Sequence, residues 1–283
     1  MPLVPMRELL NDATARGYAV PSFCVWNAET ARTVLMAAED LRAPVILMGA
    51  WGELLMLPPA DMAAVVRAIG ARCSVPFSLH LDHGHTLELV NDCLRAGYSS
   101  VMLDFSAKPI EENTEALRAV VEMARPHGAS VEGELGVVGR VDHVTGEGGT
   151  GSTLTDPSMA AEFVAATGVD ALAVSIGNAH GMYHELPRLD FGRLAQLRDA
   201  VPVPLVLHGG SGTPDADLRR AISLGIAKVN VASELVKAMR ESLMAQWSTG
   251  ENLWIPIAQA KAMESFGDVV RRWLGLTAAE GKA

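Results

Sequence analysis

Short apolar runs alternate with segments of helical periodicity along the whole chain. The runs that predict β-strands cover residues 19–23, 45–48, 77–81, 100–103, 130–135, 171–176, 205–208 and 227–231. Several runs are continuously apolar, which is typical of parallel strands that helices cover on the outside. The pattern therefore predicts an α/β protein with eight buried strands.

The segments between these runs predict amphipathic helices. They cover residues 28–41, 87–96, 110–124, 157–167, 191–199 and 214–224. Two of them carry a helix-start signal, because Asp156 precedes Pro157 and Thr213 precedes Pro214, so that a capping residue is followed by proline. Gly97 follows another helix, at the position where a left-handed residue commonly ends one.

Eight strands that alternate with helices form either a closed (β/α)8 TIM barrel or an open doubly wound sheet. The count of eight favours the barrel, and no glycine-rich nucleotide-binding motif opens a helix. A barrel typically takes about 250 residues, so the 283 residues predict a single domain over residues 1–283. Beyond about Met244 the sequence predicts extra C-terminal helices that Pro256 interrupts. Residues 136–154 are too long and too glycine-rich for an ordinary turn and predict a mobile active-site loop.

Composition narrows the choice of partners and compartment. The formal net charge is −10, which argues against nucleic acid or an anionic membrane as the partner, while a small anionic substrate remains possible. No apolar stretch is long enough to span a membrane, and the first ten residues lack the apolar core of a signal peptide. Cys24, Cys73 and Cys93 have no CxxC spacing. These features predict a cytoplasmic protein with reduced thiols.

Histidines follow three of the predicted strands, at the end where barrel enzymes build their active sites. His83 follows the third strand, His180 the sixth and His208 the seventh. Three imidazoles with one open position make a catalytic zinc site, because the open position must accept water or substrate. Each histidine alone is more simply a polar loop residue, but their convergence on one rim favours the metal site.

Carboxylates accompany these histidines. Asp82 precedes His83 directly and is either a general acid/base or a partner of the metal ligand. Asp104 and Glu134 either form a second divalent-cation site or make buried hydrogen bonds. His80 alternates with Asp82 along the strand, and His85 is expected to begin a helix. For both, a structural role or a role in supporting the metal ligands is favoured over direct metal binding.

A lysine on a barrel strand can form a Schiff base with a carbonyl substrate. Lys228 lies on the eighth predicted strand, two residues deeper than Asn230 and hence below the rim. A role as a buried charge partner is therefore the favoured interpretation.

Two short glycine- and serine-rich segments follow the last two strands. They read HGGSG, from His208, and NVAS, from Asn230. Loops at these positions of a barrel frequently hold a phosphate with backbone N–H groups, to which Ser211 and Ser233 would add hydroxyl donors. Plain turn chemistry uses the same residue types, but the pairing of the two segments favours phosphate.

Several of these motifs together resemble one enzyme family. HLDHGH, VML followed by Asp104, VEGELG, AVSIGNAHGMY, LVLHGGSG and KVNVAS occur in the order found in the class II fructose- and tagatose-bisphosphate aldolases. The resemblance runs from about residue 7 to about residue 237 and is closest to the tagatose-bisphosphate type. It implies a zinc-dependent aldolase that reversibly cleaves a phosphorylated ketose to dihydroxyacetone phosphate and an aldehyde.

The resemblance also implies roles for individual residues. His83, His180 and His208 would hold Zn²⁺, Asp82 would transfer the proton of the reacting hydroxyl, and Asp104 with Glu134 would form an alternative or second metal site. A phosphate, with a Na⁺ or K⁺ ion nearby, would be bound by Gly181, Gly209, Gly210, Ser211, Asn230, Val231, Ala232 and Ser233. A homodimer or homotetramer is expected, with a small sugar phosphate as substrate.

The chain departs from the family pattern on the side of the aldehyde. Cys24 replaces a usual asparagine, and Phe105 replaces a small residue. The loop lacks the family's proton-shuttle glutamate, so Asp142 or His143 is expected to replace it. Residues 252–256 lack the arginine that holds the far phosphate in relatives. Either the far phosphate binds less tightly, so that the substrate is a ketose 1-phosphate, or Arg140 replaces the arginine and the substrate is a ketose bisphosphate.

Two other functions remain open at this stage. A metal-dependent epimerase or another sugar-phosphate lyase could use the same barrel, but an epimerase needs acid/base groups on both faces of one carbon, and only Asp82 is a clear candidate. A protein that merely binds a metal or a sugar phosphate would have no use for Asp82 beside a ligand histidine.

Overall fold

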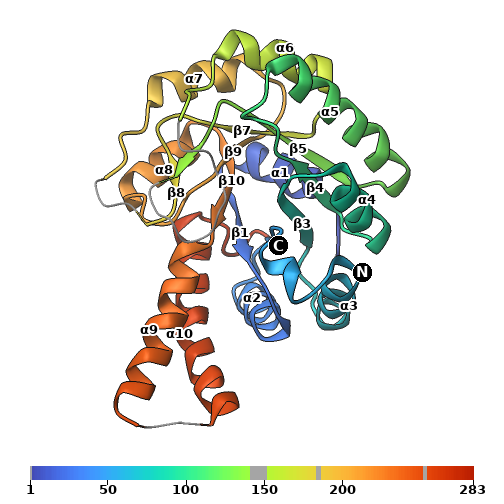
Figure 1. The fold of residues 1–283 in the computed structure, drawn as a ribbon. Coiled ribbons are helices and arrows are strands. Elements are labelled where there is room, and N and C mark those ends of the chain that lie inside the picture. The colour runs from blue at the N-terminus through green and yellow to red at the C-terminus, as the bar shows by residue number, and fades with distance from the viewer. Residues whose placement is uncertain (1, 141–151, 183–185, 251–253) are drawn as a thin grey trace.

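The computed structural model describes residues 2–140, 152–182, 186–250 and 254–283, with the side chain of Arg140 excepted. Eight parallel strands close into a barrel in the order β1-β10-β9-β7-β5-β4-β3-β2 (Figure 1). The barrel strands are β1 (Val20–Cys24), β2 (Val45–Gly49), β3 (Phe77–Gly84), β4 (Ser100–Leu103), β5 (Ser130–Leu135), β7 (Ala171–Val174), β9 (Leu205–Leu207) and β10 (Ile226–Val231). The predicted TIM barrel is confirmed.

Helices surround the barrel and follow most strands. They are α1 (Met6–Arg16), α2 (Ala28–Asp40), α3 (Pro59–Gly70), α4 (Leu87–Ala96), α5 (Ile110–Ala124), α6 (Pro157–Thr167), α7 (Phe191–Ala200), α8 (Asp215–Ser223), α9 (Ser233–Ser248) and α10 (Ile255–Leu276), with short 3₁₀ turns η1 (Glu53–Leu55) and η2 (Arg125–His127). All six helices expected from the sequence are present. The first and third were not assigned from the sequence, and both start after a proline with no side-chain cap.

Local capping chemistry explains several helix boundaries. Asn27 forms a capping box with Thr30 at the start of α2, and Asp156 accepts from two backbone N–H groups at the start of α6. Gly97 ends α4 in the left-handed conformation, as expected. The signal at Thr213 was interpreted wrongly, because Pro214 itself occupies the N-cap position of α8 and no side chain caps that helix.

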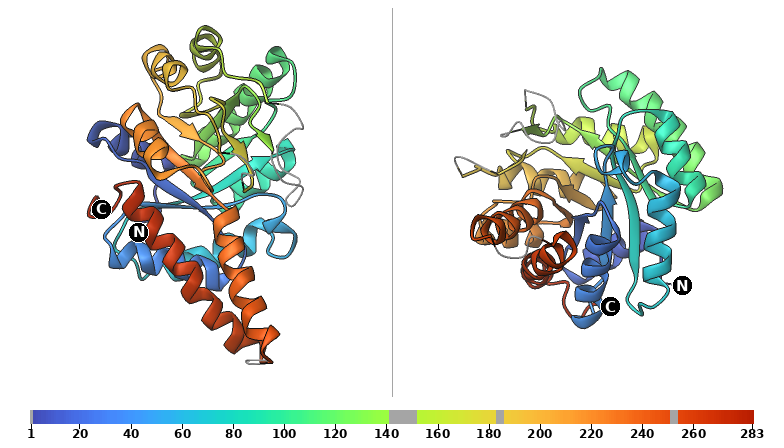
Figure 2. Two further views of the ribbon diagram at one scale, coloured as in Figure 1. Left: turned by 90° about the vertical axis from the view of Figure 1, so that its left-hand side faces the viewer. Right: turned by 60° about the horizontal axis from the view of Figure 1, so that its bottom comes forward.

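The C-terminal helices differ from the expectation. The helix α9 begins directly after β10, and Pro256 stands in the first turn of α10, where a missing N–H costs nothing. The proline therefore begins a helix and does not interrupt one. The two helices lie side by side as an arm that projects from the barrel (Figures 1 and 2). Further along, α10 packs against α2 and buries Phe266 and Trp273 in the core.

Two short strands lie outside the barrel above the strand ends. They are β6 (Gly139–Arg140) and β8 (Ala179–His180), and they pair in parallel. The expected active-site loop, residues 136–154, lies mostly outside the described residues. Its two ends meet, because Val137 and Thr153 pair through their backbones. The loop therefore starts and ends close to His180. Within the described part of the chain, no helix is both long and apolar enough to cross a lipid bilayer.

Candidate active site

The three histidines expected to bind a metal come from three separate parts of the barrel rim. His83 lies near the end of β3, His180 on β8 and His208 directly after β9. The register between β3 and β4 shifts between Leu81 and Gly84, and His83 has a positive φ of 43°. Bulges and left-handed non-glycine residues redirect side chains and cluster at functional sites. This local distortion sets the direction in which the His83 ring projects.

The three imidazoles converge in space. Ring centroids are 4.9 Å apart for His83 and His180, 4.7 Å for His83 and His208, and 5.7 Å for His180 and His208. One nitrogen of each ring lies within 4.8 Å of a nitrogen of the others. His83, His180 and His208 could therefore hold one zinc ion together, since imidazole nitrogens are among its preferred ligands.

Carboxylates orient two of the three rings. Asp104 Oδ2 lies 2.8 Å from His83 Nδ1, and Glu132 Oε1 lies 2.8 Å from His208 Nε2. The opposite nitrogens, His83 Nε2 and His208 Nδ1, are buried and have no hydrogen-bond partner among the described residues. Metal-bound histidines typically show this arrangement, in which a carboxylate holds the outer nitrogen and fixes the tautomer.

Glu134 brings a carboxylate oxygen to the same centre. Its Oε2 atom lies 3.0 Å from His208 Nδ1, yet the two atoms are not aligned for a hydrogen bond, and Oε2 has no such partner within the described residues. Glu134 is thus suited to be a further ligand. Asp104, Glu134 and His83 also form the second group that was expected to hold a cation. Because Asp104 already holds His83 by a hydrogen bond, this second site stays a prediction.

The electrostatics of the cluster favour positive charge. Burial lowers the pKa of His208, but the carboxylates of Glu132 and Glu134 outweigh burial and raise it to about 9. Burial likewise lowers the pKa of His83, while Asp82, Asp104 and Glu134 raise it well above its usual range. The surplus of carboxylates thus stabilises a cation, and three imidazoles with one carboxylate fit the donor set that Zn²⁺ prefers.

A buried ion pair supports the cluster from inside the barrel. Lys228 Nζ lies 2.7 Å from Glu132 Oε2, and both side chains are fully buried. Lys228 is therefore a buried charge partner, as expected. His80 also has the expected structural role, because its Nδ1 lies 2.8 Å from Ser100 Oγ deep in the barrel.

His85 was placed wrongly in one respect. The helix α4 begins at Leu87 with Thr86 as its cap, so His85 lies before the helix. Its ring is exposed and packs edge-on against Trp51, at 5.9 Å between ring centroids. His85 therefore takes no part in the histidine cluster.

Asp82 is held rigidly beside the cluster. Its Oδ1 atom accepts a hydrogen bond of 2.9 Å from Asn230 Nδ2, and its Oδ2 atom lies 4.0 Å from His83 Nε2. Burial raises the pKa of the Asp82 carboxyl, but the charges of His83 and Lys228 and the nearby His80 hold it well below its usual range. The carboxylate is therefore ionised in the metal-free protein.

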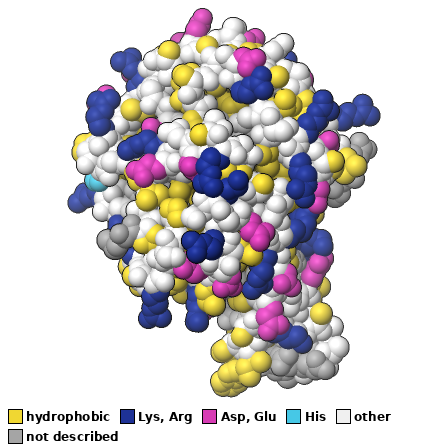
Figure 3. Space-filling model, turned by 180° about the vertical axis from the view of Figure 1, so that it is seen from behind, with side chains coloured by type: hydrophobic (Ala, Val, Ile, Leu, Met, Phe, Trp, Pro, Cys, Tyr) yellow, Lys and Arg dark blue, Asp and Glu magenta, His cyan; other side chains and the backbone are white. Residues whose placement is uncertain are grey.

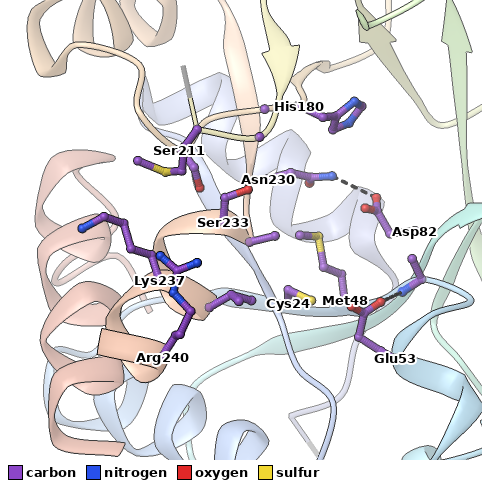
Figure 4. A pocket seen from close by; sticks show the side chains of 16 residues that line it. Cys24, Met48, Glu53, Asp82, His180, Ser211, Asn230, Ser233, Lys237 and Arg240 are labelled. Carbon is purple, nitrogen blue, oxygen red and sulfur yellow. Dashed lines mark hydrogen bonds between the residues drawn. The ribbon is translucent and has the colours of Figure 1, made fainter. Parts of the chain in front are cut away.

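A cavity of about 320 Å³ opens over this cluster (Figure 4). Asp82 and His180 line it together with six residues of the expected phosphate site, namely Gly181, Gly209, Ser211, Asn230, Ala232 and Ser233. Gly209 has a φ of +66°, and a Cβ atom there would collide with the carbonyl oxygen of Ala179, so only glycine fits. Gly210 packs against Val229 and Trp273, and the side chain of Val231 is buried in the core, so their part in phosphate binding stays a prediction.

Hydrogen bonds tie the two phosphate-type segments together. Glu234 N donates to Ser211 Oγ at 3.2 Å, and Gly212 N donates to Glu234 Oε1 at 3.0 Å. The helix α9 begins at Ser233, so its N-terminus and positive dipole end lie at the cavity wall. The segment can therefore present N–H groups and hydroxyls to an anion.

The structure adds cavity residues that the sequence analysis missed. They are Met48, Ala50, Glu53, Met182, Val236, Lys237 and Arg240. Lys237 and Arg240 are spaced three residues apart on the helix that follows the phosphate segment, a signal that could have been read from the sequence. The backbone of Arg140 pairs with that of His180. The side chain of Arg140 and the whole of Asp142 and His143 lie outside the described part of the chain.

Comparison with known proteins agrees with the fold and the site. Residues 4–282 match the family described as fructose-bisphosphate aldolase class-II. The chain is 36% identical to the YdjI aldolase of Escherichia coli K12, with 99% of each chain covered and a TM-score of 0.88. It is 30% identical to a candidate fructose-1,6-bisphosphate aldolase of Coccidioides immitis, with 97% and 96% covered and a TM-score of 0.86.

A third relative extends the fold comparison. The fructose-bisphosphate aldolase of Campylobacter jejuni is 22% identical over 98% of this chain and 95% of its own, with a TM-score of 0.84. The chain belongs to the class II fructose-bisphosphate aldolase family. It is accordingly an enzyme of the carbon–carbon lyase type, as the sequence motifs predicted.

Proposed function

We propose that the protein is a zinc-dependent aldolase that reversibly cleaves a phosphorylated ketose to dihydroxyacetone phosphate and an aldehyde. The observation that carries the proposal is the buried group of three imidazoles in contact with a cavity that Asp82 also lines. Asp104 and Glu132 hold two of those imidazoles, which supports a metal-binding role.

Asp82 is the proposed catalytic base for cleavage. Breaking the bond between C3 and C4 of a ketose requires removal of the C4 hydroxyl proton and leaves an enediolate. Asp82 is ionised and fixed by Asn230, so it can accept that proton and return it in condensation. Zinc, when bound by His83, His180 and His208, would supply Lewis-acid stabilisation of the enediolate charge.

The phosphate segment is proposed to hold the three-carbon half. Gly181, Gly209, Ser211 and Ser233 line the cavity beside Asp82, and the N-terminus of α9 adds the dipole of a helix. Binding the phosphate far from the reacting bond orients the ketose and contributes to transition-state stabilisation. Whether Na⁺ or K⁺ assists there, and whether the enzyme is of the tagatose-bisphosphate type, stays a prediction.

The proposal is tested by assaying metal-depleted and zinc-reconstituted protein. The zinc form is expected to condense dihydroxyacetone phosphate with one or more aldehydes, and the depleted form is expected to be inactive. Full activity after verified metal removal would contradict the metal requirement. Trapping a substrate adduct on Lys228 with borohydride would indicate Schiff-base chemistry instead.

The alternative is another metal-dependent sugar-phosphate lyase or an epimerase on the same barrel. Product analysis separates them, because an epimerase returns an isomer of the same carbon number and an aldolase returns two fragments. Among the described acidic residues, Asp82 and Glu53 line the cavity. The Glu53 carboxylate accepts a hydrogen bond from Ala50 N, which favours a structural role for it and hence the aldolase.

We also propose that the protein is a cytoplasmic homodimer or homotetramer. Hydrophobic side chains gather at the end of the arm (Figure 3), and the exposed ones there are Met244, Trp247, Trp254, Ile255 and Ile257. Exposed apolar patches of this kind are typical of interfaces between subunits. Sedimentation analysis of the wild type and of Trp247→Asp tests this, since a monomeric wild type would contradict it.

A further inference from the structure

Two cations face the cavity from the helix that follows the phosphate segment. Lys237 and Arg240 lie on α9 and line the same cavity as Asp82 and His180 (Figure 4). Residues three apart on a helix share a face, so the pair presents its charge to one side.

The charge of this pair is only partly neutralised by the protein. Lys237 Nζ lies 2.9 Å from Glu241 Oε1, but both side chains are about half exposed, so the ion pair is weak and easily exchanged. Arg240 has no ion-pair or hydrogen-bond partner in the described part of the chain. Like charges one helical turn apart repel, so an anion between them would be stabilising.

The pair lies further out than the phosphate segment. The helix α9 starts at Ser233, and at 1.5 Å per residue Lys237 and Arg240 lie about 6 Å and 10 Å further along its axis. Figure 4 places them across the cavity from Cys24, Met48 and Glu53, which come from β1, β2 and the segment after β2. The outer half of the cavity therefore has a cationic wall on α9 and, opposite it, a wall of two sulfur-containing side chains and the Glu53 carboxylate, which is held by Ala50 N.

We propose that Lys237 and Arg240 form a subsite for an anionic group on the aldehyde half of the substrate. The group is a phosphate or a carboxylate, because a guanidinium binds either in a bidentate fashion and an ammonium adds a point charge. The subsite rests on the proposed aldolase function. It would place cations at the far end of the substrate, where residues 252–256 supply no arginine.

Condensation kinetics test the subsite, because the two halves of the product then enter as separate substrates. The zinc-loaded enzyme is assayed with dihydroxyacetone phosphate and, in separate reactions, with glyceraldehyde, glyceraldehyde 3-phosphate or succinic semialdehyde. Arg240→Ala and the double variant with Lys237→Ala are expected to lower kcat/KM for an anionic aldehyde about 10-fold or more, as loss of charged hydrogen bonds does. The kcat/KM for glyceraldehyde and the KM for dihydroxyacetone phosphate should not change.

Matched variants exclude a general effect of charge or folding. Lys261→Ala removes one positive charge from the exposed surface of α10, outside the cavity, and should leave all rates unchanged. Arg240→Lys keeps the charge without the bidentate geometry and should restore part of the selectivity. The aldehyde whose kcat/KM falls most in the variants identifies the preferred group, which is phosphate for glyceraldehyde 3-phosphate and carboxylate for succinic semialdehyde.

The outcomes separate the subsite from the underlying function. A rise in KM for dihydroxyacetone phosphate with unchanged selectivity among aldehydes would assign the cations to the first phosphate and overturn the subsite. Equal rates for neutral and anionic aldehydes in wild type and variants would also overturn it, with the aldolase function intact. A wild type that condenses no aldehyde would contradict the aldolase function and the subsite together.

Discussion

The inner and outer halves of the cavity are built in different ways. The inner half is built on Asp82 at the cavity wall and on His83 and His208 beside it. These three side chains are buried, project from the ends of barrel strands, and each has a side-chain partner at 2.8–2.9 Å. In the outer half, Lys237 and Arg240 are exposed side chains on a helix, and Arg240 has no partner among the described residues.

This difference determines what can change in evolution or design. Replacing one member of the inner network leaves a buried charge or polar group without a partner, which is costly. Replacing an exposed outer side chain costs little stability. We therefore expect the bond-breaking chemistry to be tied to the inner half and the choice of aldehyde to vary with the outer half.

Among the predicted changes, loss of a histidine of the cluster should lower metal content and activity the most. His208→Ala is expected to remove the bound metal and lower kcat by more than about 1000-fold, because it removes an imidazole and leaves Glu132 without one of its partners. Metal content by elemental analysis and single-turnover cleavage measure both effects, and His83→Ala and His180→Ala should behave alike. The control is His85→Ala, because His85 is exposed and outside the cluster. A His208→Ala protein with full metal content and turnover would contradict the dependence of the chemistry on the inner half.

Replacement of Asp82 should affect chemistry without affecting the metal. Asp82→Ala is expected to keep zinc but to lower the rate of C–C cleavage about 100-fold or more, as removal of a general acid/base does. Asn230 would lose its hydrogen-bond acceptor, so its side chain should become more mobile. Loss of zinc from a folded Asp82→Ala protein would instead make Asp82 essential for the metal site.

The buried pair of Lys228 and Glu132 offers a test of stability. Burial raises the pKa of Glu132, but Lys228 and His208 lower it to about 2, from an ordinary value of 4.5. A depressed pKa contributes stability that is present above pH about 4.5 and is lost as the pH falls toward 2. Glu132→Gln in the metal-free protein should cost about 3 kcal/mol at neutral pH, as broken buried pairs do, and flatten the loss of stability in acid. Urea unfolding across this pH range measures both, and an unchanged pH profile would contradict the assignment.

The sequence indicated which side chains meet in the inner half, for a physical reason. Parallel barrel strands bring their C-terminal ends to one rim, so polar residues that follow apolar runs must meet there. That reasoning found His83, His180, His208 and Asp82. It did not show that Asp104 would hold His83 or that Glu132 would hold His208, because such pairs depend on the directions of side chains from different strands.

The outer half was harder to predict because it depends on tertiary packing. Whether Lys237 and Arg240 face the cavity is decided by how α9 is held, and α10 packs along it after a start at Ile255 that the sequence analysis misread as an interruption at Pro256. The bulge at His83 was likewise invisible in the apolar pattern, since a register shift changes no residue type.

The smallest effect is expected for Arg140, which the sequence suggested as the replacement for the missing tail arginine. The measurement compares kcat/KM for fructose and tagatose 1,6-bisphosphates with that for the matching 1-phosphates. Because Lys237 and Arg240 already supply cations to the outer cavity, Arg140→Ala should lower the advantage of the terminal phosphate by no more than about 3-fold, as a screened contact does. Arg240→Ala serves as the comparison and should lower the advantage of the terminal phosphate further.

If Arg140→Ala abolishes the advantage and Arg240→Ala does not, then the loop and not α9 determines selectivity. If the terminal phosphate contributes little in the wild type, the enzyme acts on ketose 1-phosphates, and the outer cations serve a carboxylate or another anionic group.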